Sequence, residues 1–358
     1  MIDYRDRIIK CALCGECNTQ CIVLREIGWL SSGPKGKILM SGLALEGKLE
    51  KDLDNLYLCT TCAKCEPVCN VGLEIVDIIE HARRKLVEAG ITKLPHEKMA
   101  NNIFNYGNPY GEKEKIRLDS KLVEKESAEY VFFPGCTAKY RVNEIMLSSI
   151  DIFNKIGLDY VVFDENYCCG SPLFRTGFAG GFEERAGLLV EKLNKKGDKV
   201  ITACPGCYRT MKNDYSKKYD LELDIQHISV FLNEKLDGID LSLEKNMTAT
   251  YHDPCHLGRH MNVYEEPRSL LKKVKNLELV EMTNNRENAL CCGSGGGVRA
   301  AFDELAYQIG KKRLEEAKET NAESIISSCP FCKLMFDTLK ENGLNAYDVT
   351  EVIAKSMR

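Results

Sequence analysis

Cysteines are the residues of this sequence whose spacing most clearly indicates chemistry. The chain has 358 residues and eighteen cysteines, and every cysteine belongs to one of four groups. Two groups share the spacing C-x2-C-x2-C-x3-C and comprise Cys11, Cys14, Cys17, Cys21 and Cys59, Cys62, Cys65, Cys69. Two longer groups are built around an adjacent pair and comprise Cys136, Cys168, Cys169, Cys204, Cys207 and Cys255, Cys291, Cys292, Cys329, Cys332. Thiolates in such spacings are soft ligands that favour iron–sulfur clusters. We therefore take all eighteen as metal ligands and predict an electron-transfer protein that also carries out sulfur redox chemistry.

Disulfides and zinc sites are two other uses of many cysteines. Disulfide frameworks are typical of small secreted chains, whereas this chain is large and its first residues lack the apolar segment of a signal peptide. Adjacent cysteines such as Cys168 and Cys169 also bridge each other only with strain. Zinc suits isolated C-x2-C pairs, but it does not explain runs of four cysteines or groups of five.

The composition excludes several classes of protein. A net charge of −4 does not provide the basic surface that nucleic-acid binding needs, so we expect no nucleic-acid partner. No segment approaches the ~18 consecutive apolar residues of a membrane span. We therefore expect a cytoplasmic protein, or one bound peripherally to a membrane partner. The hydrophobic fraction of 44% allows a sizeable core, and the length predicts two or three domains.

From residue 127 onward, short apolar runs alternate with amphipathic stretches. The runs lie at residues 130–133, 160–163, 199–202, 248–251, 277–280 and 324–326. This alternation predicts α/β domains with mostly parallel sheets. The long cysteine groups follow the runs, so we expect them at the carboxyl ends of strands, where open α/β sheets bind ligands. Nearly the same number of residues separates each cysteine of the first long group from its counterpart in the second, which predicts two copies related by a pseudo-two-fold axis.

The first part of the chain has helical periodicity. Apolar residues recur at helical spacing between Leu73 and Ala89, and Gly90 is placed to end that helix. The long insert between the two short motifs is also helical in character, so we predict an all-α ferredoxin-type module that binds two [4Fe–4S] clusters. The predicted division is 1–106 for this module, 107–126 for a charged linker, 127–245 for the first α/β domain and 246–358 for the second.

Three cysteines at i, i+3 and i+6 can bind three corners of a cubane cluster, so each short motif needs a fourth ligand. In two-cluster ferredoxins the fourth cysteine of each motif serves the other cluster. By that analogy, the first cluster is bound by Cys11, Cys14, Cys17 and Cys69, and the second by Cys59, Cys62, Cys65 and Cys21. The usual proline after the fourth cysteine is absent, with Ile22 and Asn70 in its place.

The long groups carry a specific resemblance to a known family. Two segments resemble the CCG cysteine-rich domain, namely Cys168-Cys169-Gly170 with Cys204-Pro205-Gly206-Cys207, and Cys291-Cys292-Gly293 with Cys329-Pro330-Phe331-Cys332. The sequence His252-Asp253-Pro254-Cys255-His256 also resembles the second copy in that family. The order of a helical two-cluster module and two complete CCG domains resembles heterodisulfide reductase subunits of the D type, in which the C and B subunits are fused.

This resemblance implies cofactors and a reaction. Each complete CCG set in that family holds a noncubane [4Fe–4S] cluster, so two cubane and two noncubane clusters are implied, with the ten cysteines of the long groups at the catalytic centres. The implied reaction is homolytic cleavage of the mixed disulfide of coenzyme M and coenzyme B between the noncubane clusters, while the helical module supplies single electrons. The implied setting is methanogenesis in an anaerobic archaeon.

No flavin or nicotinamide site is visible in the sequence. The glycine run at residues 293–297 lacks the preceding strand and the spacing of a dinucleotide-binding motif. Electrons must therefore come from a partner, which the resemblance implies to be a flavin-containing bifurcating subunit or a membrane b-type cytochrome.

Three of the six histidines, His252, His256 and His260, crowd Cys255. For His256 we weigh a catalytic role in anion recognition or proton delivery against hydrogen bonding to cluster sulfur. For His252 we favour hydrogen bonding to sulfur. His260 is a candidate for substrate binding.

Two arginines and one glycine are further candidates for substrate binding. Arg141 and Arg259 follow the first cysteine of each long group, where they could pair with an anionic group of the substrate or form ordinary ion pairs. Gly295 lies in the glycine run after Cys292, where backbone N–H groups can approach a cluster or an anion closely.

Two other functions stay open from the sequence. The chain could be the electron-relay subunit of a flavin-linked glycolate, lactate or glycerol-3-phosphate dehydrogenase, or an iron–sulfur subunit of a sulfur-metabolism membrane complex. The completeness of both five-cysteine groups favours the disulfide reductase. The sequence fixes neither the disulfide nor the electron donor.

Overall fold

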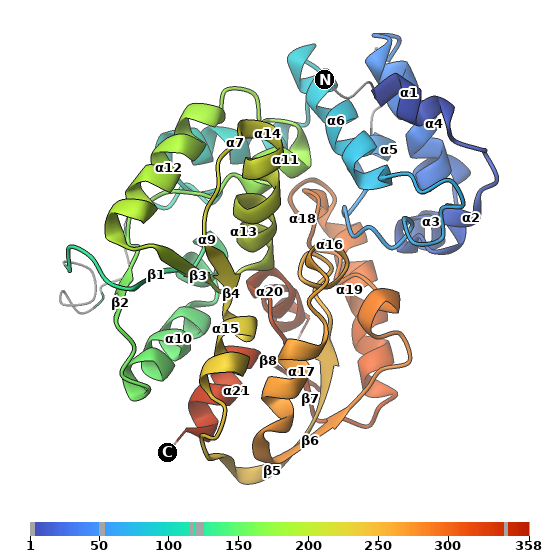
Figure 1. Cartoon of the computed structure of the whole chain (residues 1–358). Helices are drawn as coiled ribbons and strands as arrows, with labels where there is room; N and C mark the ends of the chain where they lie inside the picture. Colours follow the sequence, from blue (N-terminus) through green and yellow to red (C-terminus); the bar gives the residue numbers. More distant parts are fainter. Residues whose placement is uncertain (1–3, 50–53, 115–117, 119–124, 340–342, 358) are drawn as a thin grey trace. The chain divides into compact units, whose positions relative to one another are not determined.

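The structure is a computed structural model that describes residues 4–49, 54–114, 118, 125–339 and 343–357 (Figure 1). It contains two compact units. Unit 1 comprises Met1–Asn101, Pro172–Gly181 and Leu290–Arg313, and unit 2 comprises Asn102–Ser171, Phe182–Ala289 and Leu314–Arg358. These units group distant chain segments, so the four-part division predicted from the sequence stays a prediction. Part of the predicted linker, at 115–117 and 119–124, lies outside the described residues.

Within the described residues, the N-terminal part of unit 1 consists of helices and loops. Its helices are α1 (Tyr4–Ile9), α2 (Glu16–Thr19), α3 (Ile22–Ile27), the 3-10 turn η1 (Leu30–Ser32), α4 (Pro34–Leu45), α5 (Asp54–Tyr57) and α6 (Ile75–Glu88). α7 (Leu94–Tyr106) begins in this unit and ends in unit 2. The later segments add α11 (Ser171–Thr176), α18 (Val298–Ala301) and the start of α19 (Asp303–Lys318).

α6 lies where the sequence predicts a helix. Ile75, Ile78, Ile79 and Ala82 recur at helical spacing, and all four side chains are buried. The helix packs against α4, and its apolar face joins the core that contains Cys17. Gly90 has a φ of 75°, a left-handed conformation that glycine adopts without strain, so the helix ends there.

Unit 2 contains two four-stranded sheets in which every pair of neighbouring strands is parallel. The first has the order β2-β1-β3-β4, with β1 (Tyr130–Phe133), β2 (Tyr160–Val162), β3 (Lys199–Thr202) and β4 (Ile225–His227). Val131 in β1 pairs with Val161 on one side and Val200 on the other. All four residues of β1 are buried, as expected for an inner strand that helices cover on both faces.

The second sheet repeats this order as β6-β5-β7-β8, with β5 (Leu241–His252), β6 (Val274–Val280), β7 (Ser324–Ser327) and β8 (Asn345–Asp348). β5 extends further than the predicted run at 248–251, and its register with β6 shifts between Ser242 and Met247. The mostly parallel sheets of the predicted α/β domains are therefore present in both halves.

Several helices of unit 2 contribute buried apolar residues to a shared core. The helices of this unit include α9 (Cys136–Tyr140), α10 (Asn143–Lys155), α12 (Glu183–Lys196), α13 (Pro205–Arg209), the π-helical turn η2 (Thr210–Asp214), α14 (Tyr215–Tyr219), α15 (Ile228–Lys235), α16 (Gly258–Met261), α17 (Glu265–Lys272), the 3-10 turn η3 (Arg286–Asn288), α20 (Pro330–Thr338) and α21 (Val349–Ser356). α10 packs against α21, and α15 packs against α17. If the two halves of unit 2 were exchanged, the pair of α10 and α21 would take the place of the pair of α15 and α17. This correspondence supports the pseudo-two-fold axis, which stays a prediction.

The sheets place several cysteines at the ends of strands. Cys204 follows β3 and directly precedes α13, and Cys329 follows β7 and directly precedes α20. Pro205 and Pro330 take the first position of these two helices, where a missing N–H costs nothing and the fixed φ suits a helix. Among the described residues, none of the helices has the length and apolar character needed to cross a membrane.

Candidate metal centres

The two short motifs mix their cysteines in unit 1. Burial raises the pKa of the Cys17 thiol, and the charges of Cys11, Cys69 and Cys14 raise it further. Cys11 and Cys69 also pack against the core that contains Cys17. The backbone N–H of Leu73 donates to Sγ of Cys69 at 3.4 Å. Three cysteines of the first motif are thus grouped with the fourth cysteine of the second.

The second mixed set has the complementary membership. Burial raises the pKa of Cys65 well above its usual value, and the charges of Cys62, Cys59 and Cys21 add to that effect. The backbone N–H of Thr61 donates to Sγ of Cys59 at 3.4 Å. The two crossed ligand sets stay a prediction, which this proximity of the thiols supports.

All five cysteines of the first long group lie in unit 2, where their thiols contact one another. Sγ of Cys169 lies 3.3 Å from Sγ of Cys207. A hydrogen bond with Cys136 raises the pKa of Cys168, which is well above its usual value. Hydrogen bonds with Cys169 and Cys204 similarly raise the pKa of Cys207. One chain of sulfur contacts therefore joins the complete group.

The backbone closes tightly around this first long group. Gly135 has a φ of 83°, and a Cβ at that position would lie 3.1 Å from Sγ of Cys207. Glycine is therefore needed there for both conformation and space. The fully buried Tyr215 donates its hydroxyl hydrogen to the carbonyl oxygen of Cys169 at 2.9 Å and fixes the adjacent cysteine pair.

The second long group is divided between the two units. Cys255, Cys329 and Cys332 belong to unit 2, whereas Cys291 and Cys292 belong to unit 1. Four of these five side chains are buried, and Cys255 is half-buried.

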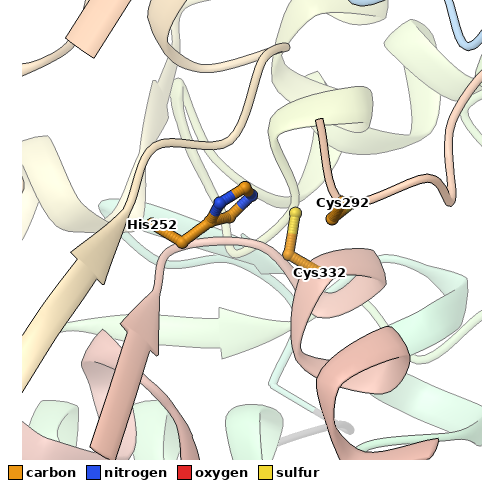
Figure 2. A group of neighbouring side chains, drawn as sticks. All are labelled: His252, Cys292 and Cys332. Carbon is orange, nitrogen blue, oxygen red and sulfur yellow. The ribbon is translucent and has the colours of Figure 1, made fainter. Parts of the chain in front are cut away.

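His252 is a further ligand candidate beside this second group. It is the last residue of β5, and its ring nitrogen lies within 4.8 Å of Sγ of Cys332 in α20 (Figure 2). The ring packs edge-on against Phe336 with the centroids 5.1 Å apart, which fixes its orientation. Its place three residues before Cys255 is the sequence signal for this role. Cys292, the third residue labelled in Figure 2, belongs to unit 1.

The thiol groups fit iron–sulfur clusters as their occupants. None of the eighteen cysteines, which all lie in the described part of the chain, forms a disulfide. Crowding and burial keep thiols protonated in the absence of a metal, and metal ions supply the positive charge that stabilises crowded thiolates. Backbone N–H groups of Gly170 and Gly293 each donate to a cysteine Sγ at 3.4 Å, as is usual around cluster ligands.

A cationic cluster lies between parts of the two long groups in unit 2. Arg209, the last residue of α13, donates from Nη1 to Nε2 of His256 at 3.3 Å and to Nε2 of His260 at 3.4 Å. The two imidazole rings pack edge to face with centroids 5.0 Å apart. A Cβ at Gly206 would lie 3.6 Å from Sγ of Cys204 and 3.9 Å from Nδ1 of His256. His256, whose chain neighbour is Cys255, therefore reaches the Cys204–Cys207 turn.

Sequence reasoning identified His256 and His260 as candidates but missed Arg209. The sequence did contain a signal for Arg209. This residue follows Cys207 by two positions and ends α13, the helix that starts at the Cys204–Cys207 turn. Its importance depends on the contact with α16, which is distant in sequence.

The two predicted substrate-binding arginines are engaged with the protein itself. Nη1 of Arg141 forms an ion pair with Glu112 at 2.8 Å. Nη1 of Arg259 donates to the carbonyl oxygens of Glu287 and Ala289 at 2.8 and 3.0 Å. Arg141 thus forms the ordinary ion pair that was weighed for it, whereas Arg259 binds backbone carbonyl oxygens. The roles of both in substrate binding stay predictions.

The glycine run after Cys292 makes the close backbone approach that its composition predicts. A Cβ at Gly295 would lie 2.6 Å from the carbonyl oxygen of Thr60, and one at Gly296 would lie 2.2 Å from that of Cys59. The approach is toward the backbone of the second short motif within unit 1. The role of Gly295 in substrate binding stays a prediction, because this packing already explains a glycine there.

Comparison with known families matches both kinds of cysteine motif. The 4Fe-4S dicluster domain family matches residues 7–73, and the Cysteine-rich domain family matches residues 130–212 and 249–337. The D subunit of dihydromethanophenazine:CoB–CoM heterodisulfide reductase from Methanosarcina barkeri is 36% identical over 97% of this chain and 93% of its own length. The chain belongs to the family of D-type heterodisulfide reductase subunits. The predicted family resemblance is therefore confirmed.

Other proteins similar to this member of the D-type family carry different names. The B subunit of fumarate reductase (CoM/CoB) from Methanothermobacter marburgensis is 34% identical over 98% of this chain and 72% of its own length. A solved structure of a hypothetical protein from Helicobacter pylori covers 100% of this chain and 74% of its own, with a TM-score of 0.58. At 10% identity, that structure supports the fold alone.

Membership in the D-type family establishes an iron–sulfur oxidoreductase. The chain combines a 4Fe-4S dicluster domain with two cysteine-rich domains. Its relatives are named as subunits of reductases, so the chain works with redox partners. These two relatives come from methanogens, in agreement with the predicted setting in methanogenesis.

Proposed function

We propose that this chain is the catalytic subunit of a reductase that acts on the mixed disulfide of coenzyme M and coenzyme B. One disulfide, two electrons and two protons give two thiols, so the S–S bond breaks and each sulfur gains one electron and one proton. The substrate class rests on the name of the relative from Methanosarcina barkeri and on the two complete five-cysteine groups.

The four cysteine sets provide ligands for four clusters in this proposal. The two mixed sets of the short motifs would hold cubane [4Fe–4S] clusters, and the two long groups would hold noncubane [4Fe–4S] clusters. When bound, the clusters supply electrons one at a time, which suits cleavage of a disulfide in two single-electron steps.

The position of His256 is the observation that carries the proposal. His256 follows Cys255 of the second long group, yet its ring approaches the turn that carries Cys204 of the first. A substrate that bound beside this ring would therefore lie close to cysteines of both long groups. A disulfide needs such a place, because its two sulfurs must receive electrons separately.

Arg209 gives this place a positive charge. Its guanidinium contacts His256 and His260, and its side chain is buried, so water screens its charge little. We assign to Arg209 and the two histidines the binding of an anionic group of the disulfide, such as a sulfonate, phosphate or carboxylate. Proton delivery by His256 to a leaving thiolate stays a prediction.

An electron-relay function is the second candidate. The relative from Methanothermobacter marburgensis is named as a subunit of a fumarate reductase. Similar chains therefore occur in oxidoreductases with different names. A relay chain would pass electrons between partners and would not itself cleave a disulfide. The electron-donating partner, either a flavin-containing protein or a b-type cytochrome, is part of the proposal in both cases.

An anaerobic assay distinguishes the two candidates. The purified chain, reduced with a viologen dye, is mixed with the coenzyme M–coenzyme B disulfide. Reoxidation of the dye with release of both thiols is the result expected of a catalytic subunit. No reoxidation in a sample that retains about sixteen irons, the content of four [4Fe–4S] clusters, would contradict the proposal and favour a relay.

A pair of variants tests the anion site in the same assay. Arg209→Gln should raise the KM for the disulfide at least about tenfold, because one charge-assisted hydrogen bond contributes roughly 1.5–3 kcal/mol. Lys212→Gln removes an exposed charge three residues further along the chain and should leave KM unchanged. Equal effects of both variants would contradict a specific site at Arg209.

A further inference from the structure

Arg83 is a buried arginine in unit 1 that none of the functions above uses. It lies in α6, its side chain is 0% exposed, and all of its guanidinium nitrogens donate to backbone carbonyl oxygens. Nε and Nη2 donate to Leu56 at 2.9 and 2.6 Å, and Nη2 also donates to Cys59 at 2.9 Å. Nη1 donates to Gly296 at 2.9 Å and to Arg175 at 2.5 Å.

These contacts connect three segments of unit 1. Leu56 lies in α5, just before the second short motif that Cys59 begins. Arg175 follows the adjacent cysteine pair of the first long group, and Gly296 follows that of the second. Gly177 permits the approach of its segment, since a Cβ there would lie 2.5 Å from the backbone of Arg83. A single side chain therefore holds the second short motif against the segments that follow both cysteine pairs.

The charge of Arg83 has no carboxylate partner among these hydrogen bonds. The nearby carboxylate of Glu80 instead forms a buried ion pair with Arg175 at 3.1 Å. A buried cation is costly unless negative charge lies near it. A cluster held at Cys59 would place the negative charge of its thiolates and of an added electron beside this guanidinium.

Lys37 places a second buried cation beside the same set of cysteines. Its side chain is 1% exposed, and its ammonium group donates to the carbonyl oxygen of Ser32 in η1. Burial raises the pKa of both Cys21 and Cys59, and the charge of Lys37 opposes that rise at each of them. Two buried positive charges, those of Lys37 and Arg83, therefore act on the set of Cys21, Cys59, Cys62 and Cys65.

The other mixed set has a cation of a different kind. Lys35 donates to the carbonyl oxygen of Leu13, beside Cys14, at 3.3 Å, but its side chain is only half-buried. Solvent screens such a charge far more strongly than one in the interior. Lys37 and Arg83 therefore contribute to an electrostatic difference between the two sets.

We propose that Lys37 and Arg83 make the cluster at Cys21, Cys59, Cys62 and Cys65 the higher-potential member of the ferredoxin-type pair. Arg83 is then a positioning residue that also holds this cluster against the segment that follows Cys291 and Cys292. Electrons leave the helical module from this cluster, one at a time, toward the long cysteine groups. This inference depends on the proposed function in requiring that clusters occupy both mixed sets.

A redox titration tests the proposal in the full chain with its clusters intact. The midpoint potentials of the two ferredoxin-type clusters are followed by electron paramagnetic resonance in Arg83→Gln, Lys37→Gln and the matched control Lys35→Gln. In the first two variants, we expect the higher of the two potentials to fall. The ratio of reduced to oxidised cluster at a fixed applied potential should change about tenfold or more. Lys35→Gln should change neither potential appreciably.

Two further variants separate charge from structure. Arg83→Lys keeps a positive charge and should restore most of the potential, although it loses most of the hydrogen bonds. Arg84→Gln removes the exposed neighbour that pairs with Glu88 and should have no effect. If Arg83→Gln does not fold, Lys37→Gln decides alone. Unchanged potentials in Lys37→Gln, or equal shifts of both clusters, would overturn the proposal.

The proposed function and this inference can fail separately. The titration uses no disulfide, so a chain that cannot reduce the coenzyme M–coenzyme B disulfide can still show the expected shift. Conversely, an active reductase with unshifted potentials would retain the proposed function and lose this inference.

Discussion

The two five-cysteine groups have similar spacing but different surroundings. The first lies entirely in unit 2, where its thiols form a chain of contacts that Tyr215 helps to fix. The second shares its members between the units, and its adjacent pair belongs with the segment that packs on the second short motif in unit 1. Similar ligand patterns are therefore embedded differently.

This difference indicates unequal tasks for the two groups. The backbone of Gly296, which follows the second pair by four residues, contacts both Cys59 and Arg83. Arg175, in the segment that follows the first pair, accepts a hydrogen bond from Arg83 through its carbonyl oxygen within unit 1. We infer that the second group receives electrons from the helical module more directly, whereas the substrate needs both groups.

The largest expected effect comes from removal of one thiolate of either group. Cys168→Ser and Cys291→Ser should each abolish disulfide turnover, because a serine hydroxyl is a poor ligand for iron. The ferredoxin-type signals in electron paramagnetic resonance should persist in both variants. The viologen assay and spectra of the same samples provide the measurement.

If turnover survived in only one of these variants, the two long groups would differ in function as well as in their structural surroundings. Survival in Cys168→Ser, for example, would leave the second group as the sole site of disulfide chemistry. Survival in both would contradict the proposed role of the long groups.

A smaller effect is expected at the contact between Gly296 and the second short motif. In Gly296→Ala the new Cβ would lie 2.2 Å from the carbonyl oxygen of Cys59, at a φ of 64°. The left-handed conformation alone costs roughly 1–2 kcal/mol, and the segment must also move away from Cys59. We expect a lower Tm and slower oxidation of the ferredoxin-type clusters by the disulfide, measured by stopped-flow absorbance.

Gly180→Ala is the matched control for this substitution. Gly180 lies in another segment of unit 1, and a Cβ there would meet nothing within 4 Å. Its effect on stability should stay within about 0.5 kcal/mol. If Gly296→Ala slows oxidation no more than this control does, the close approach has no part in electron transfer.

The sequence predicts most of the fold because inner strands carry a strong apolar signal. β1, β3, β5 and β7 lie at the predicted runs, and so do β2 and β6. β4 and β8 were missed, and both lie at the end of a sheet. β2 and β6 lie at the opposite ends of these sheets and were predicted, so edge position alone does not explain the difference. Polar residues such as Gln226 in β4 and Asn345 in β8 interrupt the apolar pattern on which the prediction depends.

The candidate site is less predictable than the fold, since its contacts are long-range. The cysteine groups could be read from spacing alone. Arg83 and Arg84, by contrast, are adjacent in sequence and identical in type. Their difference follows from helical periodicity, because Arg83 continues the buried row of Ile75 and Ile79, where a charge is unexpected. A charged residue in this buried row indicates a special role, but only the structure identifies the carbonyl groups to which Arg83 donates.

The smallest expected effect concerns pH and the glycine run of unit 1. The buried ring of His96 in α7 donates from Nε2 to the carbonyl oxygen of Gly297 at 2.9 Å. Burial lowers its pKa from 6.5 to about 4. Since the folded state binds this proton less tightly than the unfolded state, the contribution to stability is present above pH 6.5 and is lost as the pH falls toward 4.

His96→Gln separates this titration from other effects of acid. The glutamine amide can donate to the same carbonyl oxygen without titrating, so the wild type should lose up to about 2 kcal/mol relative to the variant between pH 7 and pH 5. Anaerobic urea unfolding at each pH gives this difference, and acid lability of the clusters cancels because both chains share it. His81→Gln, which replaces a half-buried ring stacked on Tyr4, should keep the wild-type slope. Parallel pH profiles for the wild type and His96→Gln would show that the segment after Cys292 is held independently of His96. Arg83 and the close packing at Gly296 would then remain as the contacts that hold the segment after Cys292 in unit 1.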